Sequence, residues 1–217
     1  MKEDYKAILF DLDGVLLNSE DTHAKAKQIT LQTYNIDYGA GIFSEFKGRT
    51  DSAFFTAISE RYTGGTISAE EMADFKKKQY IRLYNEVTAV PGAFEFLQTA
   101  RDYYCCLALV SSASASDLSL AEERFKLGKW FNTIVFRDSI DKHKPHPDPY
   151  LKALENLGIS ATEALVIEDS PNGVLSAKKA GCTVIGILTG FSSGELMAAG
   201  ADNIVENFPE LVSLLWK

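Results

Sequence analysis

The sequence has few of the residues that mark several classes of protein. Its 217 residues include only three cysteines; Cys105 and Cys106 are adjacent, and Cys182 follows a glycine. This spacing matches neither a disulfide framework nor a metal-ligand motif, so we expect buried, unreactive thiols. Six prolines and 15 glycines are too few for a disordered chain. The composition therefore predicts an ordinary globular protein with a packed core.

Long apolar runs and an excess of basic charge are also missing from the sequence. No stretch approaches the roughly 18 apolar residues of a membrane-spanning helix, and residues 1–5 carry acids where a signal peptide has a basic region. Thirty acidic against 22 basic residues give a net charge of −8, which disfavours a broad basic surface for nucleic acid. We therefore expect a cytoplasmic protein, monomeric, without a membrane or nucleic-acid partner, that holds any anionic ligand locally.

Short apolar runs recur along most of the chain. Their apolarity is continuous, which is typical of parallel strands buried on both faces of a sheet. Segments with helical periodicity separate the later runs, as in the stripe of Ala93, Phe96, Leu97 and Ala100. Strands that alternate with helices predict an α/β fold with a doubly wound, Rossmann-like parallel sheet. The runs lie at residues 7–10, 105–110, 133–136, 164–167 and 183–188.

This alternation stops for some seventy residues after the first run. The segment shows only helix-like patterns: one near residues 20–34, one that starts at about residue 50, and one that opens at Ser68, where Glu71 completes a capping-box motif. The simplest account is a sheet interrupted after its first strand by an inserted all-helical domain. We therefore predict a core of residues 1–17 and 89–217 and a helical domain of residues 18–88.

Polar side chains follow three of the predicted strands. Asp11-Leu12-Asp13-Gly14 follows the first, Ser111-Ser112 the second, and Glu168-Asp169 the fourth, while Lys144-Pro145 lies in a loop before a helix. Each motif alone is equally well explained as a turn, a helix cap or a solvated lysine. Open α/β sheets bind ligands outside the carboxyl ends of their strands, so the shared position of these motifs predicts one site.

The residue types at this edge indicate phosphoryl transfer. Asp11 and Asp13 alternate on an extended segment and point to opposite sides, so one carboxylate can attack while the other transfers a proton. Asp169, and Glu168 as a further candidate, would join Asp11 around a hard cation. Mg²⁺ takes one or two carboxylates together with phosphate oxygens and waters. We therefore expect Mg²⁺ and an aspartyl-phosphate intermediate.

Taken together, these motifs resemble those of the haloacid dehalogenase-like superfamily, in its phosphatase and phosphomutase branch, over essentially the whole chain. The resemblance implies that the helical insert is a cap domain. It also implies a role for each motif: Asp11 as nucleophile, Asp13 as acid/base with its backbone carbonyl on Mg²⁺, Ser111 and Lys144 on the phosphoryl group, and Asp169 completing the metal site. Lys144 is preferred to Lys142 because it precedes a proline, and His143 and His146 are expected on the loop surface.

Substrate choice in such an enzyme depends on the cap. We expect His23 and the glycine-flanked Arg49 to bind the substrate, together with Ser112 of the core. One of the lysines at residues 76–78 is a further candidate, but a solvated helix face is the favoured interpretation of this run. The first hypothesis is a phosphatase acting on a small phosphorylated metabolite, a sugar or polyol phosphate.

Two other functions stay open. The resemblance includes the β-phosphoglucomutases, which have a histidine at a position like His23, but Asp51 stands where their cap arginine would be. A catalytically idle binding or regulatory module with the same fold is the third hypothesis. A dinucleotide dehydrogenase is disfavoured because the turn after the first strand is not G-x-G-x-x-G, and relatives that lack the second aspartate are disfavoured because Asp13 is present.

Overall fold

The computed structural model describes residues 5–39 and 41–216. Internal contacts divide the chain into two compact units. The core unit consists of residues 1–18 and 88–217, and the helical unit consists of residues 19–87. Each unit has its own hydrophobic cluster, so each is described by itself.

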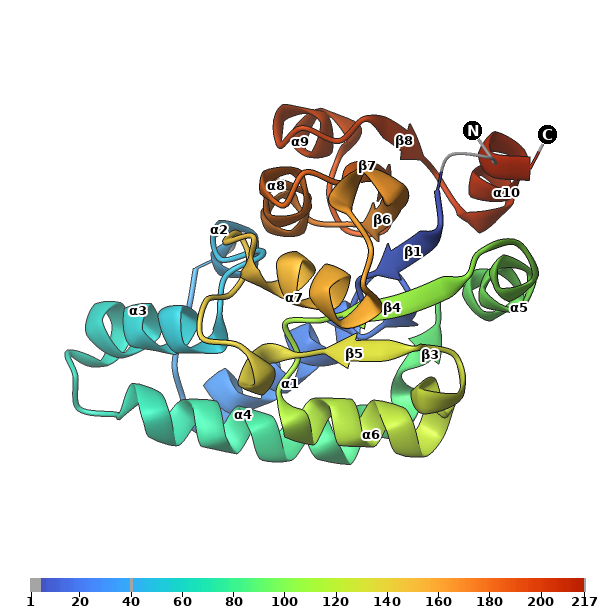
Figure 1. The fold of residues 1–217 in the computed structure, drawn as a ribbon. Coiled ribbons are helices and arrows are strands. Elements are labelled where there is room, and N and C mark those ends of the chain that lie inside the picture. Colours follow the sequence, from blue (N-terminus) through green and yellow to red (C-terminus); the bar gives the residue numbers. More distant parts are fainter. Residues whose placement is uncertain (1–4, 40, 217) are drawn as a thin grey trace. The chain divides into compact units, whose positions relative to one another are not determined.

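One parallel sheet forms the centre of the core unit, and six described strands make it up in the order β5-β4-β1-β6-β7-β8 (Figure 1). The central strand β1 is buried at every position and pairs with β4 on one side and β6 on the other. The predicted doubly wound sheet is confirmed. The sequence does not predict the short edge strand β8, because its apolar run is too short. The strands are β1 (Ala7–Phe10), β4 (Cys106–Val110), β5 (Thr133–Val135), β6 (Ala164–Glu168), β7 (Thr183–Ile187) and β8 (Asn203–Val205).

Helices cover both faces of the sheet. They are α5 (Ala93–Tyr103), α6 (Ala115–Phe125), α7 (Asp148–Leu157), α8 (Pro171–Lys179), α9 (Ser193–Ala198) and α10 (Phe208–Trp216). On one face, Leu9 of β1 shares a buried cluster with Tyr150 of α7. Phe10 contacts Phe96 of α5 with ring centroids 5.9 Å apart, and Phe96 contacts Phe208 of α10 at 5.3 Å. Successive residues of β1 thus pack against helices on opposite faces, as expected for a buried strand.

Short elements complete the core unit. The antiparallel pair β2 (Leu17–Asn18) and β3 (Thr88–Ala89) stands where the chain leaves the core unit and returns to it. Two-residue strands carry no usable periodicity, so the sequence does not predict them. Three-residue 3₁₀ helices lie at Leu127–Lys129, Arg137–Ser139 and Ala161–Glu163.

The helical unit contains α1 (Glu20–Thr33), α2 (Ile42–Glu45), α3 (Asp51–Thr63), α4 (Ala69–Leu83) and a 3₁₀ turn at Tyr84–Glu86. Thr50 and Ser68 cap α3 and α4 through their side-chain oxygens, as the sequence predicts for Ser68. The Glu71 carboxylate accepts a hydrogen bond from the Tyr34 hydroxyl at 3.0 Å, which ties α4 to the end of α1. A buried cluster that includes Leu31, Phe54, Phe55, Ile58 and Met72 holds these helices together.

The cysteines are not all buried: Cys182 is, but Cys106 is half-buried and Cys105 is exposed. Cys105 immediately precedes β4, so its side chain escapes the packing that covers the strand. Among the described helices, none combines the length and the apolarity needed to cross a membrane.

Candidate active site

The carboxyl end of β1 places Asp11 in the middle of the sheet edge. The amide of Asp11 donates to the Ile167 carbonyl of β6 at 3.1 Å, so the sheet hydrogen bonding continues through this residue. The side chain is almost fully buried, with only 8% of the residue exposed. A carboxylate in such a place needs charge partners, because burial without them is costly.

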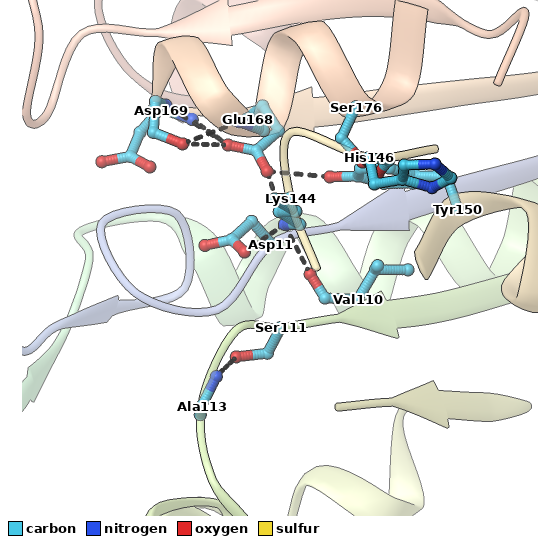
Figure 2. Close-up of polar contacts among 12 residues, drawn as sticks. Asp11, Val110, Ser111, Ala113, Lys144, His146, Tyr150, Glu168, Asp169 and Ser176 are labelled. Carbon is cyan, nitrogen blue, oxygen red and sulfur yellow. Dashed lines mark hydrogen bonds and ion pairs between the residues drawn. The ribbon is translucent and has the colours of Figure 1, made fainter. Parts of the chain in front are cut away.

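Lys144 is the cation that meets Asp11. Its Nζ lies 2.6 Å from Asp11 Oδ1, 2.6 Å from Glu168 Oε1 and 2.8 Å from the Val110 carbonyl (Figure 2). These three contacts use the three donors of the ammonium group. Lys144 is therefore held rigidly between β1, β4 and β6, although it comes from the loop before α7.

Glu168, at the end of β6, is saturated with donors. Its Oε1 accepts from Lys144 and from the hydroxyl of Tyr150 at 2.8 Å, and its Oε2 accepts from the amides of Asp169 and Ser170 and from the Ser170 hydroxyl. The residue has no exposed surface. Tyr150 is a site residue that the sequence does not indicate, because its place in an apolar helix stripe is also explained by core packing.

Asp169 completes a group of carboxylates. Asp11, Glu168 and Asp169 each offer an oxygen, and these oxygens all lie within 4.8 Å of one another. Glycines make room for the acids: a β-carbon at Gly14 or Gly190 would overlap Asp169, and one at Gly173 would overlap Glu168. Three carboxylates face one lysine here, so a divalent cation would balance the remaining charge. Asp11 and Asp169 fit hard-cation ligation, whereas the oxygens of Glu168 are committed to five donors.

The electrostatics of this edge follow from burial and crowding. The pKa of Asp11 is raised to about 8: burial is the largest cause, Lys144 opposes it, and the charges of Glu168 and Asp13 add to it. Burial alone would lower the pKa of Lys144, but Asp11 and Glu168 together hold it above its usual value. The pKa of Tyr150 is raised by burial and by Glu168, so its phenol stays a proton donor.

The carboxyl end of β4 contributes a buried hydroxyl group. Ser111 is 2% exposed, and its Oγ accepts a hydrogen bond from the Ala113 amide at 2.9 Å (Figure 2). Because this oxygen accepts, its own proton is available to donate to an anion. Ser112 is exposed, and its carbonyl accepts from Arg137 Nε at 2.9 Å.

In the loop before α7, Lys144 lies in the site, whereas Lys142 and the two histidines lie on the surface. Lys144 is the lysine that lies against Asp11, and Lys142 is exposed. His143 is exposed, and the exposed His146 contacts Asp148 at 2.9 Å. The expected surface position of both histidines is therefore confirmed.

The other residues predicted for the site are Asp13 of the core unit and His23 and Arg49 of the helical unit. Asp13 is half-buried and lies near enough to Asp11 for its negative charge to raise the pKa of Asp11. Within the helical unit, Arg49 is exposed, and its guanidinium carbon lies 5.7 Å from the centroid of the Phe46 ring. His23 lies on α1. The prediction that residues 76–78 form a solvated face is wrong for Lys76, which is buried beside His23; Lys77 and Lys78 are exposed.

Comparison with protein families matches most of the chain. A family model described as haloacid dehalogenase-like hydrolase matches residues 8–187, a span that contains every core motif above. The sequence is 28% identical to a phosphorylated carbohydrates phosphatase of Thermotoga maritima, over 93% of this chain and 94% of that protein. It is also 28% identical to phosphoglycolate phosphatase of Escherichia coli, over 94% of this chain and 89% of that one.

Solved structures share the fold over almost the full length. CbbY from Rhodobacter sphaeroides, in complex with phosphate, superimposes with a TM-score of 0.81 at 27% identity, over 95% of this chain and 96% of that chain. The similarity thus extends across both units in sequence.

Proposed function

Because the chain belongs to the haloacid dehalogenase-like hydrolases and is a phosphoric monoester hydrolase of that family, we propose that it is a Mg²⁺-dependent phosphatase acting on a small sugar or polyol phosphate through an aspartyl-phosphate. The observation that carries the proposal is the buried carboxylate of Asp11, held at 2.6 Å by Lys144 beside Asp169. The phosphorylated-carbohydrate phosphatase among its relatives supports the substrate class.

The side chains of Asp11 and Asp169, with the backbone carbonyl of Asp13, would hold the magnesium ion. When bound, the ion neutralises charge on the transferring phosphoryl group. We assign Glu168 a positioning role in place of direct ligation, because its oxygens accept five hydrogen bonds and orient both Lys144 and the Asp169 amide.

The protein's own residues can then carry two successive displacements. In the first, an oxygen of Asp11 forms a bond to phosphorus, the bond from phosphorus to the ester oxygen breaks, and Asp13 gives that oxygen a proton. In the second, Asp13 takes a proton from water, whose oxygen bonds to phosphorus and releases the Asp11 carboxylate. Ser111 would donate to the phosphoryl oxygens, and Lys144 would do so with the donor that it gives to Asp11 in the substrate-free protein.

We further propose that the helical insert, residues 18–88, acts as a cap that selects the organic part of the substrate. His23 and Arg49 are its proposed binding residues, with Ser112 contributed by the core. We expect the cap to determine substrate selectivity, because the core motifs engage only the phosphoryl group.

A β-phosphoglucomutase-like mutase is the second candidate, supported by His23. In that reaction, the phosphoryl group on Asp11 passes to a sugar hydroxyl instead of to water. Asp51 argues against it, because an acid stands here where the mutases carry the arginine of their cap turn.

A panel of phosphate esters with Mg²⁺, scored for free phosphate, tests the proposal. Asp11→Asn should abolish release, whereas Asp141→Asn, an exposed acid in the loop of Lys144, should retain it. Supplying β-glucose 1-phosphate and following glucose 6-phosphate separates the candidates: isomerisation faster than hydrolysis would establish the mutase. A wild-type protein inert on the whole panel would favour the idle binding module.

A further inference from the structure

Tyr150 of α7 is fully buried, yet its hydroxyl group lies at the active site. The hydroxyl donates to Glu168 Oε1 at 2.8 Å, and Lys144 Nζ donates to the same oxygen at 2.6 Å (Figure 2). One carboxylate oxygen therefore joins a phenol and an ammonium group. Neither the proposed metal site nor the two displacements on phosphorus use the phenol.

The aromatic ring of Tyr150 makes a second contact to Lys144. The ammonium nitrogen lies over the ring, 5.0 Å from its centroid. This separation is within the range of about 6 Å at which an aromatic face attracts a cation. Tyr150 thus acts on Lys144 in two ways: directly through its ring, and indirectly through the oxygen of Glu168 that both residues share.

Packing alone does not explain the hydroxyl group of Tyr150. The residue belongs to a cluster of buried side chains that includes Leu9, Val110 and Val166, and the ring of a phenylalanine would fill the same space. A buried hydroxyl carries a desolvation cost that its hydrogen bond must first offset. The acceptor of this hydrogen bond is also specific, because it is the carboxylate oxygen that holds Lys144.

The hydrogen bond from Tyr150 changes how the positive charge of Lys144 is shared between two acids. Lys144 Nζ lies 2.6 Å from an oxygen of Asp11 and 2.6 Å from an oxygen of Glu168. Because the phenol satisfies part of the negative charge on Glu168, that residue attracts the ammonium group less strongly than an unshared carboxylate would. More of the positive charge is then available on the side of Asp11, where a phosphoryl group would bind.

We propose that Tyr150 is a positioning residue for the reaction: by donating to Glu168 and placing its ring against the ammonium group, it keeps Lys144 directed at Asp11 and able to donate to a phosphoryl group there. The assignment rests on the proposed function, since it takes a phosphoryl group as the ligand beside Asp11. It involves residues of the core unit only. Removal of the hydroxyl should therefore weaken the binding of a phosphate anion to the folded protein.

Calorimetric titration with inorganic phosphate in saturating Mg²⁺ tests the assignment apart from catalysis. The stoichiometry of binding reports the folded fraction, and the Kd reports the site within that fraction. Tyr150→Phe, which keeps the ring, should raise the Kd at least fivefold, whereas a merely structural role would lower the stoichiometry and leave the Kd unchanged. Tyr104→Phe is the matched control and should not change the Kd. Tyr104 is also a buried tyrosine of the core unit, but it precedes the amino end of β4, at the other end of that strand from Ser111.

A second variant covers the case in which Tyr150→Phe does not fold. Tyr150→Met removes the ring contact as well as the hydrogen bond, so it should raise the Kd at least as much. An unchanged Kd in the folded variants, a failure of both variants to fold, or no phosphate binding by the wild-type protein would overturn the assignment. Hydrolysis of esters by the wild-type protein is scored separately. If no ester is hydrolysed while Tyr150→Phe raises the Kd, the proposed function fails and the role of Tyr150 stands; hydrolysis with an unchanged Kd would mean the reverse.

Discussion

Gly173 on α8 lies directly against the carboxylate of Glu168, so that a β-carbon at this position would overlap the carboxylate oxygens. Glycine inside a helix costs about 1 kcal/mol relative to alanine, and residue 173 has no left-handed backbone that would require it. Space for Glu168 is therefore the physical reason for this glycine. Since Glu168 orients Lys144, the glycine acts on the active site through two successive contacts.

Gly173→Ala should displace Glu168 and lower both stability and phosphatase activity. We expect a loss of about 1–3 kcal/mol in the free energy of unfolding, as for other overpacked sites, and a reduction in kcat of at least tenfold. Gly194→Ala is the matched control, because Gly194 also lies in a helix but a β-carbon added there would extend into open space. Denaturant unfolding and steady-state kinetics measure the two effects; similar results for both variants would contradict the steric explanation.

Gly14→Ala should weaken magnesium binding specifically. Gly14 has a φ of +82°, and an added β-carbon would overlap Asp169. Gly158 has a φ of +66° with nothing within 4 Å, so Gly158→Ala carries a similar backbone penalty, about 1–2 kcal/mol, without the contact. We expect the Mg²⁺ concentration for half-maximal activity to rise at least tenfold in Gly14→Ala only. An equal rise in both variants would mean that backbone strain, and not Asp169, is responsible.

The positions of the five longer-run strands (β1, β4, β5, β6 and β7) and of the core motifs can be predicted because each depends on local sequence. Continuous apolar runs mark buried strands, and the acids, serines and lysine that follow them meet because parallel strands end at one edge. Ser170-Pro171 at the start of α8 is readable in the same way, as a cap with proline at the first turn. These signals need no knowledge of distant contacts.

Other features depend on contacts between distant residues, and local sequence does not predict them. Lys76 lies in a run of three lysines that local sequence assigns to solvent, and only the approach of α1 and the start of α3 buries it. The sequence indicates Tyr150 only as a core residue, because its hydrogen bond to Glu168 depends on the folded structure. The exposure of Cys105 depends on where β4 begins, and strand ends are the least certain part of a sequence-based assignment.

Lys144→Met should destabilise the protein strongly when no metal is bound. The variant leaves Asp11 and Glu168 buried without their shared cation, and breaking such a pair typically costs about 3–5 kcal/mol. Lys152→Met removes an exposed lysine from its pair with Glu155 and should cost less than about 1 kcal/mol. Urea unfolding in EDTA, at a pH above the Asp11 pKa of about 8, gives both values. A small loss in Lys144→Met would show that the two acids are protonated or solvated in the absence of the lysine.

Magnesium affinity should rise with pH because a proton competes for Asp11. Burial raises the pKa of Asp11 to about 8 in the metal-free protein, so at lower pH the carboxyl must lose its proton before it can ligate. The sign follows: the apparent Kd for Mg²⁺ should fall by up to about tenfold for each pH unit between pH 6 and 8, then level off above 8. Calorimetric titrations with Mg²⁺ at pH 6, 7, 8 and 9 measure this profile. Asp11→Asn has no carboxyl to titrate, so its weaker binding should lose most of this pH dependence. A flat wild-type profile would show that Asp11 is already ionised before the metal binds, and that Lys144 outweighs burial at this site.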